Sequence, residues 1–457
     1  MRRATALVSF GIVLAVVAVS LGGCVPRLPG LNPLAWLPRT PAAAPPVKVG
    51  EPTVGTHTLQ TFIPMTAVTF SDGMASIGEQ NAESGKVTIP AVLRPEGGEA
   101  WNVERVGSIY RFVSGAAELG STRIVVGTTP TSEVPGKDEM PWVGVSDNGG
   151  AYRVEELGKS VFGGRSAELR GISSTGNTLD PDSVFMAVGG VERAAGYLVG
   201  NPSGTDPFAI VSEDGRTWTQ TASLPLPDGV NGAEAWAVTY APSGTAHPGT
   251  IVVGMGWADA GPGNILGRKV GIVWHTADAG KTWDIISDDN FFFPGRDFSP
   301  SLVAADDSTI VVAGWADAQG QIGSKVDQKQ AESIEWYIGA DGVWHIISDG
   351  KSLRATRSSL TTALVARKAG GFIEASEIYD TATGSYAPGA AQKGSPVVRL
   401  FSSPDAANWT LIDDSVPGIE KGAVVDGIAE YANRDAFFGI DNTTHSMAWV
   451  VDRASIK

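Results

Sequence analysis

The sequence predicts an all-β protein folded as a β-propeller, and three observations lead to this prediction. From about residue 57 onward, short runs rich in Val, Ile, Phe and Trp alternate with clusters of Gly, Asp, Pro and Ser, and no helical period is visible. Glycine, which is needed for tight turns, is abundant at 57 of 457 residues. A turn motif built around an acidic residue also recurs along the chain at a nearly constant spacing.

The repeated motif predicts the size of the structural unit. Its acidic positions recur about every 64 residues, a length that accommodates four short strands and is typical of one propeller blade. The strongest copies are at 212–218 and 276–283, and a degenerate copy is at 95–101. The acids of the five better copies are Asp147, Asp214, Asp278, Asp341 and Asp405.

These units resemble Asp-box repeats, also called BNR repeats, which have the form Ser-x-Asp-x-Gly-x-Thr-Trp and occur in the sialidase-like superfamily of propellers. Turn chemistry explains the pattern, because the hydroxyl and the carboxylate can bond to backbone N–H groups of a hairpin and glycine supplies a positive φ. The tryptophan can pack between neighbouring sheets. We therefore interpret these acids and tryptophans as structural residues.

Aligning the units predicts seven blades of four strands each. The last blade contains three strands before the chain stops, so its fourth strand must come from elsewhere. The segment 56–63 alternates suitably and is otherwise unpaired, and we expect it to complete the last blade and close the ring. The alternative is a ring of six blades with residues 57–95 outside it.

The N-terminus predicts export and a lipid anchor. Arg2 and Arg3 precede an apolar stretch of secretory length, which makes residues 1–23 a predicted signal peptide. The stretch ends in Leu-Gly-Gly-Cys24, which resembles the lipobox of bacterial lipoproteins; that resemblance implies a diacylglyceryl thioether on Cys24, the only cysteine. Residues 24–55 are rich in proline and read as an extended tether, and residues 56–457 as the propeller. The predicted location is extracytoplasmic, anchored in the cell membrane.

Composition narrows the classes of partner. The net charge of −15 disfavours nucleic acid, whose phosphates need a basic surface that is not evident here. The five histidines are dispersed without metal-ligand spacing, and no phosphate-binding glycine loop opens a helix, so no metal and no cofactor is predicted.

Candidate ligand-binding residues follow strand b of three blades, where the connections to strand c are long. Trp257 with Asp259, and Trp315 with Asp317, belong to a repeated Gly-Trp-Ala-Asp sequence that we expect at equivalent rim positions; Glu377 and Tyr379 are the counterparts in blade 6. An indole beside a carboxylate suits a sugar, because the ring stacks and the acid accepts hydroxyl protons. The alternative is that these aromatic residues only fill gaps between blades.

The leading hypothesis is a cell-surface lipoprotein whose propeller, without catalysis, binds a glycan or an envelope protein through the b–c face. A glycoside hydrolase is the first alternative. Its catalytic residues cannot be assigned, and Thr88 in 87–91 stands where the sialidase resemblance would require an arginine. A structural or assembly role is the second alternative.

We predict that Cys24→Ala releases the protein from the membrane or stalls its processing. The reason is that the thiol is the atom that the lipid would modify, and two or more acyl chains give stable anchoring. Fractionation of cells expressing the variant beside the parent measures the effect, and continued anchoring of the variant would contradict the prediction.

Overall fold

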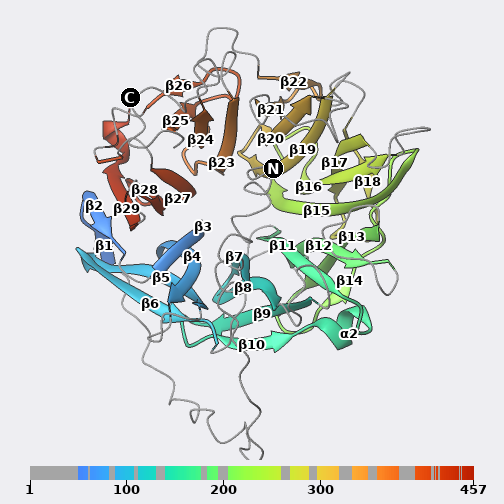
Figure 1. Ribbon diagram of the computed structural model, residues 1–457, viewed down its shortest axis with the longest axis horizontal. Helices are drawn as coiled ribbons and strands as arrows, with labels where there is room; N and C mark the ends of the chain where they lie inside the picture. The colour runs from blue at the N-terminus through green and yellow to red at the C-terminus, as the bar shows by residue number, and fades with distance from the viewer. Residues whose placement is uncertain are drawn as a thin grey trace, which may run out of the picture.

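The computed structural model consists of seven β-sheets arranged in a ring around a central axis (Figure 1). This arrangement confirms the predicted seven-bladed propeller and excludes six blades. The structure describes residues 50–59, 62–81, 88–107, 112–129, 139–175, 183–193, 204–258, 268–287, 296–318, 332–347, 358–379, 397–412, 416, 418–419, 423–441, 443 and 445–456. The predicted signal peptide, Cys24 and nearly all of the predicted tether lie outside these residues.

Each blade is an antiparallel meander, with strand a nearest the axis and strand d outermost (Figure 1). Blades 1 to 3 contain β3 (Phe62–Phe70), β4 (Gly73–Asn81), β5 (Thr88–Gly98) and β6 (Ala100–Arg105); β7 (Phe112–Leu119), β8 (Thr122–Thr129), β9 (Met140–Asp147) and β10 (Arg153–Glu156); and β11 (Ala167–Ser174), β12 (Phe185–Glu192), β13 (Thr205–Ser212) and β14 (Thr219–Gln220).

The remaining blades repeat the pattern. They contain β15 (Val230–Ala241), β16 (Gly249–Ala258), β17 (Arg268–Thr276) and β18 (Asp284–Ile285) in blade 4; β19 (Arg296–Ala305), β20 (Ile310–Ala318), β21 (Glu332–Ile338) and β22 (Trp344–Ile346) in blade 5; β23 (Ser358–Ala366), β24 (Phe372–Tyr379), β25 (Val397–Ser403) and β26 (Thr410–Leu411) in blade 6; and β27 (Val424–Tyr431), β28 (Arg434–Ile440), β29 (Ser446–Asp452) and the N-terminal β2 (Gly55–Thr58) in blade 7.

Little of the described chain is helical. The helix α2 (Gly158–Phe162) connects blades 2 and 3, and a 3₁₀ turn, η5 (Arg453–Ser455), follows β29. Among the described residues, no helix is both long enough and apolar enough to cross a membrane.

The turns between strands c and d hold the hydrogen bonds that their residue pattern predicts. In blade 3, one oxygen of Asp214 accepts the backbone N–H groups of Arg216 and Thr217 at 2.8 and 2.7 Å. These bonds, led by that of Thr217, lower the pKa of Asp214 below its ordinary value. The glycine that follows, Gly215, has φ +73°, and a β-carbon there would lie 2.4 Å from the side chain of Ile124 in blade 2. The turn therefore also fits the neighbouring blade.

The hydrophobic core is divided among the boundaries between blades. Buried residues form seven clusters, and each cluster draws side chains from two neighbouring blades, including the pair of blades 7 and 1. The strands therefore bury side chains on both faces, as in Phe185–Glu192, whose eight residues are all buried. Such a sheet needs a partner on each side.

Every inner strand contains a β-bulge at the same place. The register shifts by one residue in all seven a strands, and the strand-b residue paired just before the shift is glycine in six blades. A β-carbon at that glycine would lie only 1.8–2.4 Å from a carbonyl oxygen of strand a, which excludes larger residues. The bulged residues are Met65, Ser114, Arg170, Trp236, Ser301, Thr362 and Asp426.

The N-terminal segment closes the ring at its outer edge. β2 pairs antiparallel with β29, from Gly55 opposite Val450 to Thr58 opposite Met447, which confirms the prediction that an N-terminal strand completes the last blade; the strand is shorter than the predicted 56–63, because Phe62 and Ile63 already belong to β3. The preceding β1 (Gly50–Pro52) pairs in parallel with β5 of blade 1. Residues 50–58 therefore connect the first and last blades across the closing boundary.

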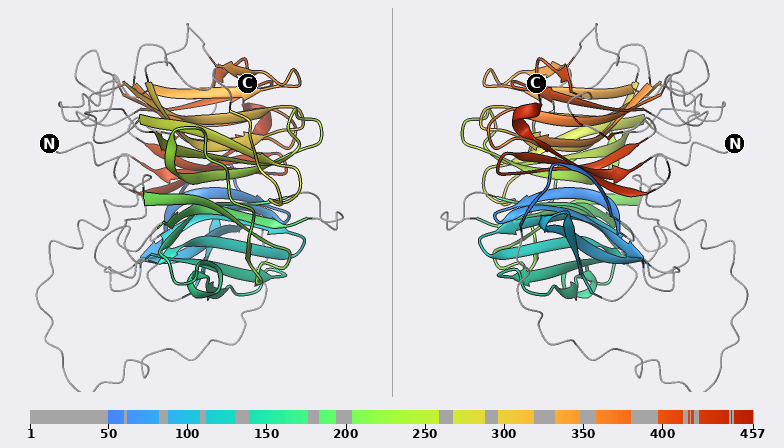
Figure 2. Two further views of the ribbon diagram at one scale, coloured as in Figure 1. Left: turned by 90° about the vertical axis from the view of Figure 1, so that its right-hand side faces the viewer. Right: turned by 90° about the vertical axis from the view of Figure 1, so that its left-hand side faces the viewer.

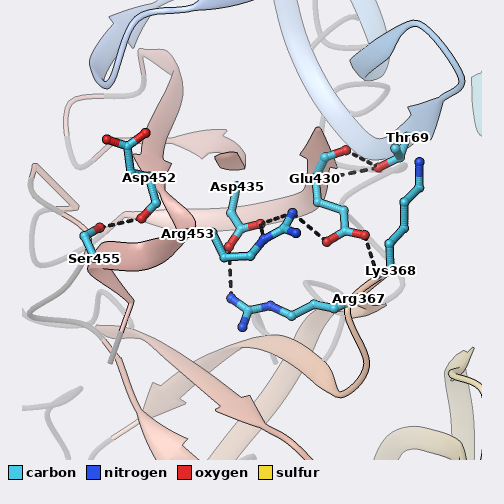
Figure 3. A network of polar contacts seen from close by, with 8 residues as sticks. All are labelled: Thr69, Arg367, Lys368, Glu430, Asp435, Asp452, Arg453 and Ser455. Carbon is cyan, nitrogen blue, oxygen red and sulfur yellow. Dashed lines mark hydrogen bonds and ion pairs between the residues drawn. The ribbon is translucent and has the colours of Figure 1, made fainter. Parts of the chain in front are cut away.

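A network of charged side chains joins blade 7 to blade 6, and a threonine hydroxyl extends it to blade 1 (Figure 3). Asp435 in β28, which is fully buried, accepts hydrogen bonds from Arg367 of blade 6 at 2.9 Å and from Arg453 at 3.2 and 3.3 Å. Arg453 also contacts Glu430 in β27 at 2.8 Å. The backbone of Glu430 bonds in turn to the hydroxyl of Thr69 in blade 1. The network joins blades 6, 7 and 1.

We predict that Asp435→Ala lowers the free energy of unfolding by about 3 kcal/mol or more, because it leaves two arginines without their shared buried carboxylate. Thermal and denaturant unfolding of the purified domain measure the change. Asp452→Ala is the matched control: its carboxylate is half exposed and lies 3.7 Å from Arg434. A loss within about 0.5 kcal/mol is expected for the control, and equal effects of the two variants would refute the role of Asp435.

Candidate functional site

The two faces of the propeller carry different connections. Antiparallel order places the a–b and c–d turns on one face and the b–c and d–a connections on the other, and the strands run between the faces (Figure 2). The b–c connections of blades 1 to 6 fall on residues 82–87, 130–138, 194–203, 259–267, 319–331 and 380–396, which lie outside the described part of the chain. Predicted Asp259 belongs to them. The described site residues are those of the strands.

The register corrects the expected equivalence of the two Gly-Trp-Ala-Asp sequences. The glycine opposite the bulge is Gly254 in blade 4 and Gly314 in blade 5, so Trp257 follows it by three positions and Trp315 by one. The two tryptophans therefore differ by two residues in their position along strand b, and they are not equivalent under the symmetry of the blades. The identical Gly-Trp-Ala-Asp sequences do not reveal this offset, because the bulge in the facing strand determines the register.

Apart from Glu377, four predicted rim residues lie in described strands, and of these only Trp257 has a described side chain. Trp257 is half-buried at the end of β16, and its indole nitrogen is buried without a hydrogen-bond acceptor among the described residues. Trp315, Asp317 and Tyr379 are placed by their backbone in β20 and β24, and their side chains lie outside the description. The described side chains therefore include no complete pair of the predicted rim, and the predicted pairing stays a prediction.

The sixth predicted residue, Glu377, is buried at the boundary of blades 6 and 7. Its charge acts on Asp426, the bulged residue of the inner strand of blade 7. Burial, and next the charge of Glu377, raise the pKa of Asp426 to about 8. The pair places a carboxylic acid, protonated at neutral pH, on the wall of the channel.

A more elaborate group of side chains occupies the inner strands of blades 3 and 4. We call Glu139, Glu168, Arg170, Glu234 and Trp236 the inner-strand cluster. Arg170 and Trp236 are the bulged residues of β11 and β15, and Glu168 and Glu234 each precede a bulge by two positions. Two neighbouring inner strands therefore share the same arrangement, a glutamate two positions before the bulged residue.

Contacts in the cluster centre on the guanidinium of Arg170. One of its nitrogens lies 2.8 Å from a carboxylate oxygen of Glu168 and 3.7 Å from one of Glu234. The guanidinium carbon lies 4.9 Å from the centre of the Trp236 ring, which is a cation–π distance. Arg170 thus connects the two equivalent acids and stacks on the ring of Trp236.

A glycine makes room for this arrangement. Gly190 in β12 has no side chain, and a β-carbon there would lie 2.9 Å from the side chain of Glu234. Glu234 therefore reaches from blade 4 over the second strand of blade 3, where it is 1% exposed. Glu168 extends correspondingly toward blade 2, where its carboxyl forms a hydrogen bond with Glu139.

The acids outnumber the cations in the cluster, and this alters their protonation. Burial, together with the charges of Glu139 and Glu234, raises the pKa of Glu168 to about 8 in spite of Arg170. Because Glu168 is protonated at neutral pH, it can donate a hydrogen bond as well as accept one. The side chains of Glu168 and Arg170 remain 20% and 29% exposed, so solvent reaches them.

Two donors of the cluster have no partner among the described residues. These are the Nε of Arg170 and the indole nitrogen of Trp236, and both atoms are buried. Buried donors in proteins are nearly always satisfied, by protein, water or ligand. A cluster that combines such donors, carboxyl groups and an aromatic ring can bind a molecule with several hydroxyl or amino groups.

A second set of buried acids lies between blades 5 and 6 and has a different character. The hydroxyl of Thr361 lies 3.1 Å from Glu335 and 3.2 Å from Glu374, and all three residues are buried. Ser376, which takes the place of the glycine opposite the bulge, donates to Glu374. These groups form hydrogen bonds with one another between the sheets. Within the described residues, no three histidine, cysteine or acidic side chains are arranged to hold a metal ion.

Comparison with known proteins identifies similar backbones only. No protein-family model matches the sequence, and no curated protein matches it. Among solved structures, a GH74 xyloglucanase from Xanthomonas campestris is 13% identical, with a TM-score of 0.48 over 90% of this chain and 56% of that one. The β-propeller domain of the Trilobed protease from Pyrococcus furiosus is 10% identical, with a TM-score of 0.45 over 86% and 96%.

A third similar structure is a sialidase from Trypanosoma rangeli in complex with the inhibitor DANA, at 13% identity and a TM-score of 0.40 over 74% of this chain and 58% of that one. This chain thus spans little more than half of the xyloglucanase and of the sialidase. At these identities the likeness concerns the fold alone.

We predict that Asp426→Asn changes the pH dependence of stability. The pKa of Asp426 is raised from 3.8 to about 8 in the fold, so the contribution of its carboxyl to stability is complete below about pH 4 and is lost as the pH rises toward 8. The variant cannot ionise, so it should melt near the parent at pH 4.5 and a few degrees above it at pH 8.

Asp441→Asn is the control of opposite sign. Hydrogen bonds from the backbone of His445 and from Thr443 outweigh burial and lower the pKa of Asp441, so its carboxylate stabilises the fold above about pH 4. This variant should melt below the parent at pH 8. A pH-independent difference between Asp426→Asn and the parent would contradict the protonated Asp426.

Proposed function

We propose that this protein is a lipid-anchored surface lipoprotein whose propeller binds a saccharide at the inner-strand cluster, from the b–c face, without catalysis. One observation carries the proposal: the cluster combines an indole ring, three carboxyl groups and two buried donors that have no partner among the described residues. Saccharides need such a mixture, because each hydroxyl donates and accepts while the C–H face of a sugar packs on an aromatic ring.

The predicted anchor fits this role. A lipid on Cys24 followed by a proline-rich tether would hold the propeller outside the cell membrane, where glycans and envelope proteins are present. An envelope protein is the alternative partner for the same face. Its binding would depend on the long b–c connections more than on the channel wall.

We expect the soluble domain from residue 50 to bind defined saccharides on a glycan array, and Trp236→Ala to lower that binding at least about tenfold. Removal of the indole takes away an apolar contact and a donor together, an effect of roughly 1.4 kcal/mol or more. The variant Trp257→Ala, measured in parallel, tests the rim predicted from the sequence. A folded domain that binds no saccharide would refute the proposal and favour a protein partner.

A second candidate function is glycoside hydrolysis, and the protonation of Glu168 is the observation that favours it. A glycosidase needs one carboxylic acid that donates a proton and a second carboxylate nearby. Glu168 has the raised pKa of such an acid, and Glu234 contacts the same guanidinium nitrogen. In the hydrolase alternative, Glu168 would protonate the leaving oxygen.

Turnover of a panel of fluorogenic glycosides distinguishes the two candidates. A hydrolase should lose at least about a hundredfold in kcat with Glu168→Gln, because the amide cannot transfer a proton. Glu155→Gln, at an exposed position of β10, is the matched control. Binding without turnover by the parent protein would eliminate the hydrolase.

A further inference from the structure

Resting on the proposed function, we propose that the saccharide is an amino sugar with a free, unacetylated amino group, which Glu168 and Glu234 hold beside Arg170. The amino group would approach from the channel, where Glu168 is partly exposed. Sugars with acidic groups would be excluded.

The number of charges favours a cation. Glu168 is surrounded by Glu139, Glu234 and Arg170, which are three acids and one base when Glu168 itself is included. The guanidinium already contacts two of those acids, at 2.8 and 3.7 Å. Among these described residues the net charge is −2 when all three acids are ionised, and in the free protein a proton on Glu168 reduces it to −1. An ammonium group of a ligand can take the place of that proton.

The same contacts disfavour an anionic sugar. A carboxylate or sulfate ligand would need a free cation, whereas Arg170 is engaged by its own acids and stacks on Trp236. Placing a further negative charge among Glu139, Glu168 and Glu234 would be repulsive in a site that is partly shielded from water. The cluster therefore favours cationic over anionic ligands, whereas an arginine-lined site favours anionic ones.

The remaining donors suit the rest of a sugar ring. The Nε of Arg170 and the indole nitrogen of Trp236 lack acceptors among the described residues, and hydroxyl oxygens would supply them. A simple amine would leave these two donors unused. The cluster thus matches a molecule that carries an ammonium group and several hydroxyls at once, which describes an amino sugar.

Binding must then release a proton. The ammonium of the ligand donates to the carboxylate of Glu168, whose own proton leaves to solvent, so one proton is released for each amino group bound. Below about pH 8 the affinity should therefore rise with pH until the amine of the ligand deprotonates. An N-acetylated sugar, which is neutral, releases no proton.

The test compares two tetrasaccharides of the same linkage: the β-1,4 oligomer of glucosamine and its fully N-acetylated form. Isothermal titration of the soluble domain at pH 6, where the amine of the ligand is largely protonated, in buffers of different ionisation enthalpy, measures affinity and proton release together. We expect the free amine to bind at least about tenfold more tightly, with release of close to one proton. Glu168→Gln should abolish the release and most of the preference, and Glu155→Gln should change neither.

The outcomes separate the inference from the proposed function. Equal or tighter binding of the N-acetylated oligomer, with no proton release, would overturn the amino-sugar inference and leave saccharide binding intact. No binding of either oligomer, together with an array that is silent for amino, neutral and acidic sugars of other linkages, would overturn the proposed function. Binding of an array glycan through an acidic sugar would also overturn the inference, because it requires a free cation in the site.

Discussion

The structure depends on one constraint: each blade is apolar on both faces and must bury both against neighbours. The hydrophobic core is accordingly seven separate clusters, one at each boundary between blades. A row of such sheets would leave two apolar faces in water, whereas a ring leaves none. The closing boundary is therefore as important as the other six.

Both ends of the described chain contribute to the closure of the ring, one at its outer edge and one on the face of the a–b turns. At the outer edge, residues 50–58 add β1 to blade 1 and β2 to blade 7. On the a–b turn side, the carboxylate of Glu430 contacts Arg453 just after the last strand, and its backbone bonds to the hydroxyl of Thr69 in blade 1. If Cys24 is the anchor, the tether enters the fold through the strands that close it. A pull on the tether would then act first on β1 and β2.

The bulge in every inner strand creates the positions at which function can vary. In six blades a glycine of strand b accommodates the bulged backbone. The bulged residues themselves differ, and their side chains range from methionine to arginine and aspartate. Hydroxyl groups at two of these positions, Ser114 and Thr362, bond to the next inner strand and stabilise the ring. Arg170 and Trp236 instead meet each other across a boundary, where Gly190 gives Glu234 space to join them. The scaffold repeats and the site does not.

The sequence by itself determined the repeat: its acidic turns and alternating strands predicted seven blades and an N-terminal closing strand, because turn chemistry and strand patterning are local properties. The tertiary structure decided which residues meet. Trp257 and Trp315 carry identical neighbours yet differ in height, since the bulge opposite each strand shifts the register. The sequence did contain a signal for the inner-strand cluster, the Glu-x-Arg of 168–170 and the Glu-x-Trp of 234–236 in aligned strands. Its meaning depended on contacts between blades, because a side chain of blade 4 reaches Arg170 only through the space that a glycine of blade 3 leaves open.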